Sequence, residues 1–250
     1  MAGNTHVTVL LDRSGSMSAI RDEVVEGFNA FLREQQALPG KATLTLVQFD
    51  SVAPFEVVHR LSPIAEVPPL SRATFQPRGA TPLLDALGRG IIDIENAIAG
   101  LAPADAPDAI VVAVITDGME SASQEFTLED VQWLLTQKRS HENWRFIFQS
   151  ADLAAIELAC SAGIRRADTA LFSADAHGVA GTWTSISEAV AATRAGASAA
   201  RMEPALPQPA RAPGRCPLRK GVDRMVRDLR RPLASMTLMD RLSQCFRFIS

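Results

Sequence analysis

Oxygen-bearing side chains follow the first apolar run of the sequence at alternate positions. Asp12, Ser14 and Ser16 come directly after the run Val7 to Leu11. A continuous apolar run of this kind predicts a buried strand, so the three side chains are placed at the end of a core element. Carboxylate and hydroxyl oxygens are hard donors of the kind that Mg²⁺ prefers in proteins. The stretch therefore predicts a cation site at a strand end.

Two more oxygen donors occupy comparable places later in the chain. Asp117, in VITDG, ends the apolar run Ala109 to Thr116, and Thr81 stands just before Pro82, which favours the start of a helix. In a doubly wound sheet, ligands bind beyond the carboxyl ends of the strands. The predicted ligand set is therefore Asp12, Ser14, Ser16, Thr81 and Asp117, with Mg²⁺ as the expected ion and Mn²⁺ or Ca²⁺ as alternatives. Neutral hydroxyls leave the ion able to attract an external carboxylate.

The elements that must position these residues alternate along the first 200 residues. Ile20, Val24, Phe28 and Phe31 share one face of a helix, and ATLTLVQFD and FEVVH have the pattern of a hairpin. We expect strands at 7–11, 42–50, 55–59, 109–116, 145–149 and 169–172, and helices at 20–31, 83–101, 128–139, 153–162 and 179–193. This order predicts an α/β fold with a doubly wound, mostly parallel, Rossmann-like sheet and helices on both faces.

With its motifs DRSGS, GAT and TDG, the chain resembles a von Willebrand factor type A domain over about residues 5–195. The resemblance implies a metal-ion-dependent adhesion site. In such a site Ser14, Ser16 and Thr81 coordinate the ion through their hydroxyls, and Asp12 and Asp117 bind it directly or through water. It also implies one antiparallel edge strand, and a protein partner that presents an Asp or Glu to the metal. It names no particular partner.

Two other interpretations of these residues were weighed. In a purely structural one, Asp12 and Ser16 cap helices and Asp117 forms a turn. In an enzymatic one, the protein is a Mg²⁺-dependent phosphohydrolase. Haloacid dehalogenase-like enzymes, however, carry an acid two residues after the first Asp, where this chain has Ser14. The chain lacks a P-loop and a nucleophile elbow, and its scattered histidines are expected at the surface or at strand ends. We therefore expect neither enzymatic activity nor a small-molecule substrate.

The bulk composition predicts a folded protein of the cytoplasm. It contains 47% hydrophobic and 21% charged residues, which is ordinary for a globular protein. The first residues lack the pattern of a secretory leader, and no apolar run approaches the ~18 residues of a membrane span. The three cysteines, Cys160, Cys216 and Cys245, are widely spaced, which fits a reducing compartment.

The last fifth of the chain differs in charge from the rest. Residues 201–250 hold eleven basic and four acidic residues, a net charge of +7, whereas residues 1–200 carry −10. Five prolines fall between Pro204 and Pro217. We expect a von Willebrand A-like domain at 1–196, a Pro/Ala-rich linker at 197–221 and a basic amphipathic tail at 222–250. Such a tail could contact nucleic acid, a membrane, a partner groove or its own acidic domain, but a loosely held extension is the preferred interpretation.

Overall fold

A six-stranded sheet forms the centre of the molecule. The computed structural model describes residues 4–139 and 143–196, and the predicted linker and tail lie outside these ranges. The strand order is β3-β2-β1-β4-β5-β6. Only the edge strand β3 runs antiparallel to its neighbour. The strands are β1 (Thr5–Asp12), β2 (Ala42–Phe49), β3 (Glu56–Pro63), β4 (Ala109–Thr116), β5 (Trp144–Ser150) and β6 (Thr169–Leu171). The predicted mostly parallel sheet with one antiparallel edge strand is confirmed.

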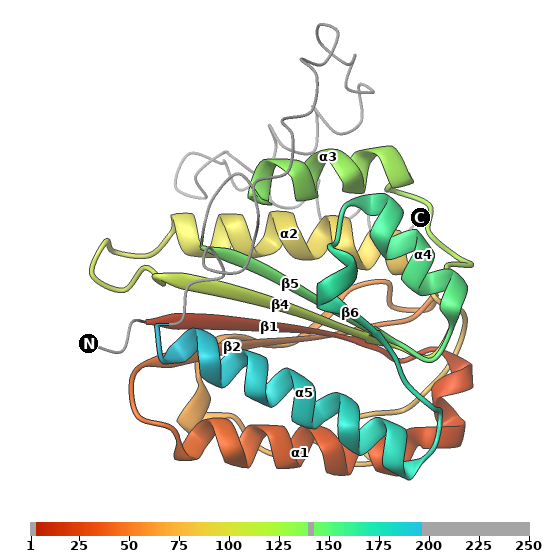
Figure 1. The fold of residues 1–250 in the computed structure, drawn as a ribbon, viewed down its shortest axis with the longest axis horizontal. Coiled ribbons are helices and arrows are strands. Elements are labelled where there is room, and N and C mark those ends of the chain that lie inside the picture. Colours follow the sequence, from red (N-terminus) through yellow and green to blue (C-terminus); the bar gives the residue numbers. More distant parts are fainter. Residues whose placement is uncertain (1–3, 140–142, 197–250) are drawn as a thin grey trace, which may run out of the picture. The chain divides into compact units, whose positions relative to one another are not determined.

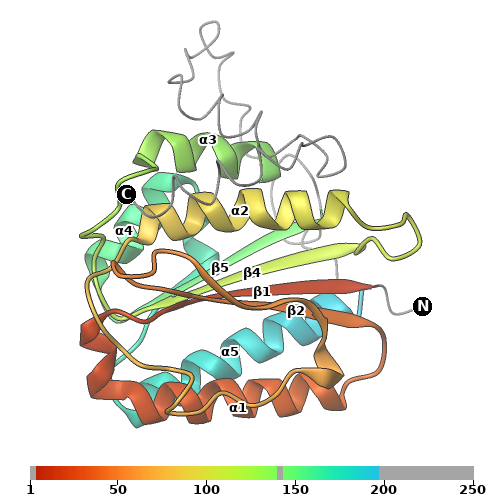
Figure 2. The ribbon, with the colours of Figure 1, turned by 180° about the vertical axis from the view of Figure 1, so that it is seen from behind.

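Helices cover both faces of this sheet, as the alternating pattern predicted. They are α1 (Arg21–Ala37), α2 (Leu83–Ala99), α3 (Leu128–Arg139), α4 (Leu153–Ala162) and α5 (Ala176–Arg194). In Figure 1, α1 and α5 lie below the sheet and α2 and α3 above it, and Figure 2 shows the same layers from behind. A short 3₁₀ helix, η1 (Gly15–Ile20), joins β1 to α1. None of the helices in the described ranges is long and apolar enough to cross a membrane.

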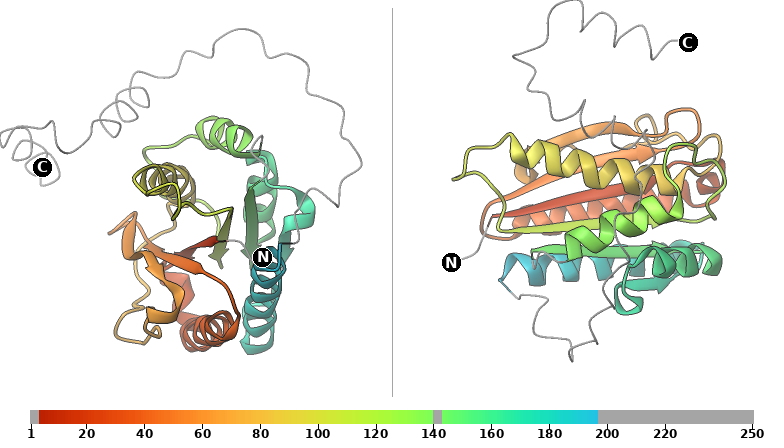
Figure 3. Two further views of the ribbon diagram at one scale, coloured as in Figure 1. Left: turned by 90° about the vertical axis from the view of Figure 1, so that its left-hand side faces the viewer. Right: turned by 90° about the horizontal axis from the view of Figure 1, so that it is seen from above.

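The two central strands bring distant parts of the sequence level with each other. Asp12 of β1 pairs in register with Phe49 of β2, and Leu11 pairs with Ile115 of β4. Strands β1 and β4 are buried along almost their whole length because helices pack on both sides of them. The end-on view of Figure 3 shows the two helical layers on opposite sides of the twisted sheet. The carboxyl ends of β1, β2 and β4 therefore meet at one edge, where the predicted metal ligands follow.

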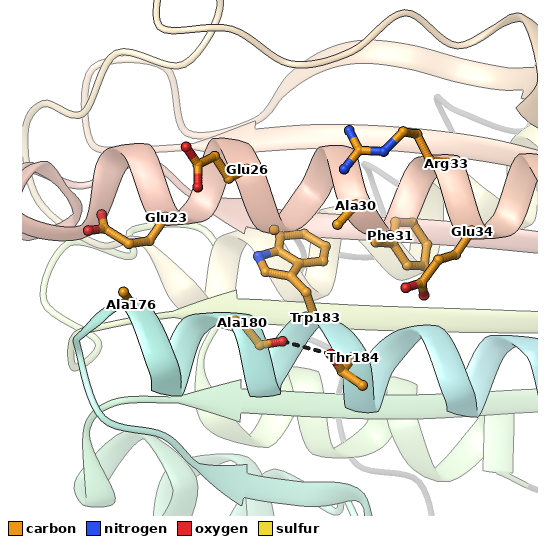
Figure 4. Close-up of a pocket in the computed structure, with 11 residues that line it drawn as sticks. Glu23, Glu26, Ala30, Phe31, Arg33, Glu34, Ala176, Ala180, Trp183 and Thr184 are labelled. Atoms are coloured by element: carbon orange, nitrogen blue, oxygen red, sulfur yellow. Dashed lines mark hydrogen bonds between the residues drawn. The ribbon is translucent and has the colours of Figure 1, made fainter.

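Helices α1 and α5 approach each other closely around one aromatic side chain. The indole of Trp183 lies 5.6 Å from the ring of Phe28 and 5.7 Å from that of Phe31, measured between centroids. A Cβ atom at Gly27 would lie only 2.0 Å from Cδ1 of Trp183, so the absence of a side chain there makes room for the indole. Figure 4 shows Trp183 between the two helices, in a groove of about 310 Å³ that is lined by Glu23, Glu26 and Glu34 among others. None of the five predicted metal ligands lines this groove.

The ends of several helices differ from the sequence-based prediction, and one histidine is buried in the sheet. Helix α5 begins at Ala176 rather than at 179, because Asp175 accepts a hydrogen bond from the Gly178 N–H and caps the helix earlier. Helix α2 begins at Leu83 as expected, with Pro82 as its cap residue, and ends at Ala99 rather than at 101. His6, expected at the surface or at a strand end, is the second residue of β1 and is fully buried. Its ring nitrogens are satisfied by the hydroxyls of Thr43 and Thr8, at 2.8 and 3.0 Å.

Candidate metal centre

The five predicted ligands come from three segments that meet at the carboxyl edge of the sheet. Asp12 is the last residue of β1, and Ser14 and Ser16 lie at the start of η1. Thr81 lies just before α2, and Asp117 directly follows β4. Asp12, Ser14 and Thr81 are buried, Asp117 is partly buried and Ser16 is exposed. The structure thus brings all five together, with Ser16 on the side that faces solvent.

Hydrogen bonds link four of these residues, Asp12, Ser14, Ser16 and Asp117, directly. The Ser16 hydroxyl donates to Oδ1 of Asp117 at 2.6 Å, and the hydroxyls of Ser14 and Ser16 lie 3.1 Å apart. Asp12 accepts the backbone N–H of Ser14 on Oδ1 at 2.6 Å and the hydroxyl of Thr116 on Oδ2 at 2.5 Å. Residues 100 positions apart in the sequence are therefore held within hydrogen-bond distance.

Gly118 leaves room beside the hydroxyl donors. A Cβ atom built on Gly118 would lie 3.6 Å from the Thr81 hydroxyl oxygen and 3.7 Å from that of Ser16. Thr81 and Ser16 thus border the same small space from two different segments. Because glycine places no side chain there, an ion and a ligand group can approach both hydroxyls.

The two carboxylates lack a cationic partner. Burial raises the pKa of Asp12 to about 6, although hydrogen bonds from Thr116 and Ser14 oppose this. Burial also raises the pKa of Asp117. Within residues 4–139 and 143–196, no lysine or arginine forms an ion pair with either acid. A buried carboxylate without a counter-charge is unfavourable, so these residues fit a bound cation.

Hydroxyl donors are essential to any such site. In the part of the chain that the structure describes, no three or more His, Cys, Asp or Glu side chains form a group that could hold a metal. Two carboxylates alone offer few ligands, whereas the addition of three hydroxyls gives an all-oxygen set. An all-oxygen set of this kind suits Mg²⁺, Mn²⁺ or Ca²⁺ better than a soft ion.

A buried ion pair supports the loop that carries Asp12 and Ser14. The guanidinium of Arg13 donates to Oδ2 of Asp50 at 2.7 Å and to Gln48 at 3.1 Å, and it lies 2.7 Å from Glu56. The Arg13 backbone N–H donates to Phe49, and its carbonyl accepts from Arg78. Arg13 therefore ties the metal loop both to the end of β2 and to the segment that leads to Thr81.

A second set of contacts fixes Thr81 relative to Asp117. The Thr81 N–H donates to the hydroxyl of Ser121, and the Ser121 N–H donates to the Thr81 carbonyl. Glu120 accepts the N–H groups of Leu84, Ala122 and Ser123. Glu120 therefore joins the loop after β4 to the first turn of α2.

Sequence reasoning missed this supporting layer. Thr116 and Arg13 stand inside the predicted motifs, but nothing in their spacing shows that they contact Asp12 and Asp50. The one available signal was an arginine between two predicted metal ligands, a position that requires a nearby acid if the side chain is buried.

Comparisons with known proteins support the fold. No protein-family model matches the chain, and no curated protein matches it. Among solved structures, the pilus adhesin SpaC from Lactobacillus rhamnosus GG has a TM-score of 0.55 at 12% identity, over 76% of this chain and 30% of SpaC. A second structure is proximal thread matrix protein 1 from the mussel byssus, with a zinc-occupied MIDAS motif. It has a TM-score of 0.52 at 14% identity, and the match covers 76% of this chain and 46% of the mussel chain. The match thus spans less than half of either neighbour. Together with the strand order, these likenesses define a von Willebrand A-like α/β fold.

Proposed function

We propose that this chain is a protein-binding module that holds a divalent cation through Asp12, Ser14, Ser16, Thr81 and Asp117. The observation that carries the proposal is the convergence of two unpaired carboxylates and three hydroxyls at the carboxyl edge of the sheet. The bound ion would supply a positive charge to which an Asp or Glu of a protein partner binds.

Mg²⁺ is the proposed ion, with Mn²⁺ and Ca²⁺ as alternatives. The donors are all oxygens, which these ions prefer. The zinc reported in the motif of the mussel protein supports a divalent ion in general, and it makes Zn²⁺ a useful competitor in binding assays. Zinc sites usually include imidazole or thiolate ligands, which the five proposed residues do not offer.

The proposed role is binding rather than catalysis. Among the residues that the structure describes, no histidine or lysine forms a hydrogen bond with any of the five that would let it act as a base. A cytoplasmic location belongs to the same proposal and rests on the wide spacing of the three cysteines, which fits a reducing compartment. Fractionation of the native cell tests that location.

The test of function is affinity capture from a lysate of the native cell, in Mg²⁺ and again in chelator. We expect a partner that the full-length protein captures only in Mg²⁺, and that Thr81→Ala and Asp117→Ala fail to capture while their circular dichroism stays native. Asp93→Asn, which changes a partly buried acid that lies ten residues after the start of α2 and pairs with Arg60, serves as a control that retains capture. Capture that persists in chelator would contradict the metal-dependent role.

The enzymatic alternative has its own test. Purified protein with Mg²⁺ is expected to release no phosphate from a generic phosphomonoester, since Ser14 occupies the position of the second acid that would protonate the leaving group. Release of phosphate that disappears in Asp12→Asn would show that the centre is hydrolytic.

A further inference from the structure

Exposed large hydrophobic side chains gather at the edge that carries the metal centre. Five are exposed among the described residues, and four of them, Val52, Met119, Leu153 and Leu171, are more than half exposed. Each of the four lies at or just beyond the carboxyl end of a different strand: β2, β4, β5 and β6, respectively. The fifth, Trp133, lies on α3. Single exposed apolar residues are common on protein surfaces, but four along one edge indicate a contact surface.

The strand order arranges these four residues in a line, which we call the apolar stripe. From Val52 the stripe passes β1, which carries Asp12, before it reaches Met119, Leu153 and Leu171. Neighbouring strands lie about 4.8 Å apart, so the stripe extends over about 19 Å. The metal centre at β1 and β4 interrupts the stripe between Val52 and Met119. Met119 directly follows Gly118, the residue that borders the Thr81 and Ser16 hydroxyls.

The backbone beneath the stripe is firmly held. Asp50 accepts the N–H groups of Val52 and Ala53, and Asp152 accepts those of Ala154 and Ala155 at the start of α4. The contacts of Glu120 fix the residues that follow Met119. The backbone therefore holds the stripe residues in place before a partner binds. This preorganisation lowers the free-energy cost of ordering these residues on binding.

Charge along the edge favours one orientation for a ligand. On the Val52 side, Arg78 keeps a half-exposed side chain beside the metal loop. At the other end the acids Asp152 and Asp175 cap α4 and α5. Arg78 is paired with Asp50, so the bound cation supplies the attraction for a partner carboxylate. That carboxylate is repelled from the β5 and β6 side, where a partner can offer apolar groups.

We propose that the apolar stripe receives an extended segment of a protein partner, with one Asp or Glu at the metal and large apolar residues across Met119, Leu153 and Leu171. This inference rests on the proposed function of the metal centre. From the metal to β6 is about two and a half strand spacings, roughly 12 Å, and an extended chain covers about 3.3 Å per residue. The apolar residues of the partner therefore fall within about four positions of its acid, on one side of it.

The test is selection from a displayed library of random peptides on the full-length protein in Mg²⁺. We expect selected peptides to contain an acid with large apolar residues within about four positions on one side. Met119→Ser and Leu171→Ser should each raise the Kd of a selected peptide about tenfold, because each removes an apolar contact. Trp133→Ser, at the exposed apolar residue outside the stripe, is the matched control and should leave the Kd unchanged.

The outcomes separate this inference from the proposed function. Metal-dependent peptides that bind the stripe variants as tightly as wild type would overturn the stripe and leave the metal centre intact. Peptides that bind undiminished in chelator would contradict the metal centre itself, and failure to select any peptide in Mg²⁺ would contradict the stripe as a peptide site. Self-association, or sedimentation with phosphatidylserine vesicles, that Met119→Ser abolishes would assign the stripe to a second copy or to a membrane and overturn the proposal.

Discussion

Asp12 and Asp50 stand at the carboxyl ends of neighbouring parallel strands and are both fully buried, yet within residues 4–139 and 143–196 only Asp50 has a basic partner. Burial would raise the pKa of Asp50, but hydrogen bonds from Ala53, Arg13 and Val52 outweigh it, and the pKa is lowered. For Asp12 burial prevails, and the pKa is raised to about 6. The chain thus neutralises one buried acid with Arg13 and leaves the other for a cation, which is the division expected at a metal site.

Loss of Arg13 should destabilise the fold strongly. Arg13→Gln removes the buried partner of Asp50 and leaves only the half-exposed Arg78 as its counter-charge. Breaking a buried pair typically reduces the free energy of unfolding by about 3–5 kcal/mol, and because Arg78 remains we expect a loss of about 3 kcal/mol. Arg60 pairs with Asp93 at the surface, so Arg60→Gln should cost about 1 kcal/mol or less. Urea unfolding of both variants measures the difference. Equal losses would show that the Arg13 pair contributes no more than a surface pair.

Two helical glycines should respond to alanine in opposite directions. Alanine is favoured over glycine in a helix by about 1 kcal/mol, and nothing lies within 4 Å of a Cβ at Gly181, so Gly181→Ala should stabilise by up to that amount. At Gly27 the new methyl would overlap the buried indole of Trp183. Overpacking outweighs the helix preference there, so Gly27→Ala should destabilise by at least about 1 kcal/mol. Thermal unfolding checks both, and a stabilised Gly27→Ala would show that α1 and α5 separate easily.

The buried His6 should make stability depend on pH. Burial lowers its pKa from 6.5 to about 4, opposed by a hydrogen bond that the ring donates to Thr43. Between these values the unfolded chain binds a proton that the folded chain does not, so the stability present above pH 6.5 is lost as the pH falls toward 4. Between pH 7 and 4.5, wild type should lose about 2–3 kcal/mol more than His6→Gln. Urea unfolding at both pH values measures this, and parallel losses would contradict the assignment.

Glu120 should influence metal affinity without touching the ion. It joins the loop after Asp117 to the start of α2, so Glu120→Ala should loosen Thr81 relative to Asp117. Groups that orient metal ligands typically change affinity by about 10–100-fold when removed. Glu129→Ala, on the first turn of α3, is the matched control for a lost surface acid. Mg²⁺ titration of both variants tests this. Equal Mg²⁺ affinities of the two variants would show that Glu120 only caps the start of α2.

Much of the fold could be predicted because local signals and burial agree. The strand Ala109–Thr116 and the helix Leu153–Ala162 match their predicted ranges residue for residue. The first is a continuous apolar run, and the second is bounded by the capping Asp152 and by Gly163, whose φ of 110° ends the helix. The edge strand β3 extends to Pro63, beyond the predicted end. Its pairing with β2 is irregular, and this disturbs the alternation of apolar and polar residues from which the end was predicted.

The candidate site could be predicted only in part. Asp12, Ser14 and Ser16 form a local motif, and Thr81 and Asp117 stand at places that a doubly wound sheet brings together. Their supporting contacts depend on partners far away in the chain: Arg13 on Asp50 and Asp12 on Thr116. No periodicity or spacing marks such pairs, because they arise only when strands align in register.

Calorimetric titration of Mg²⁺ into the full-length protein tests the metal centre most directly. Wild type should bind one Mg²⁺ in a saturable step, and saturation to about 100 times Kd should add about 2.7 kcal/mol to the free energy of unfolding. Asp12→Asn keeps the size of the side chain but removes its charge, so it should show no saturable binding while its circular dichroism stays native. Asp93→Asn should bind as wild type does. Undiminished binding by Asp12→Asn, or no binding by wild type at millimolar Mg²⁺, Mn²⁺ or Ca²⁺, would contradict the assignment of these residues to a divalent cation.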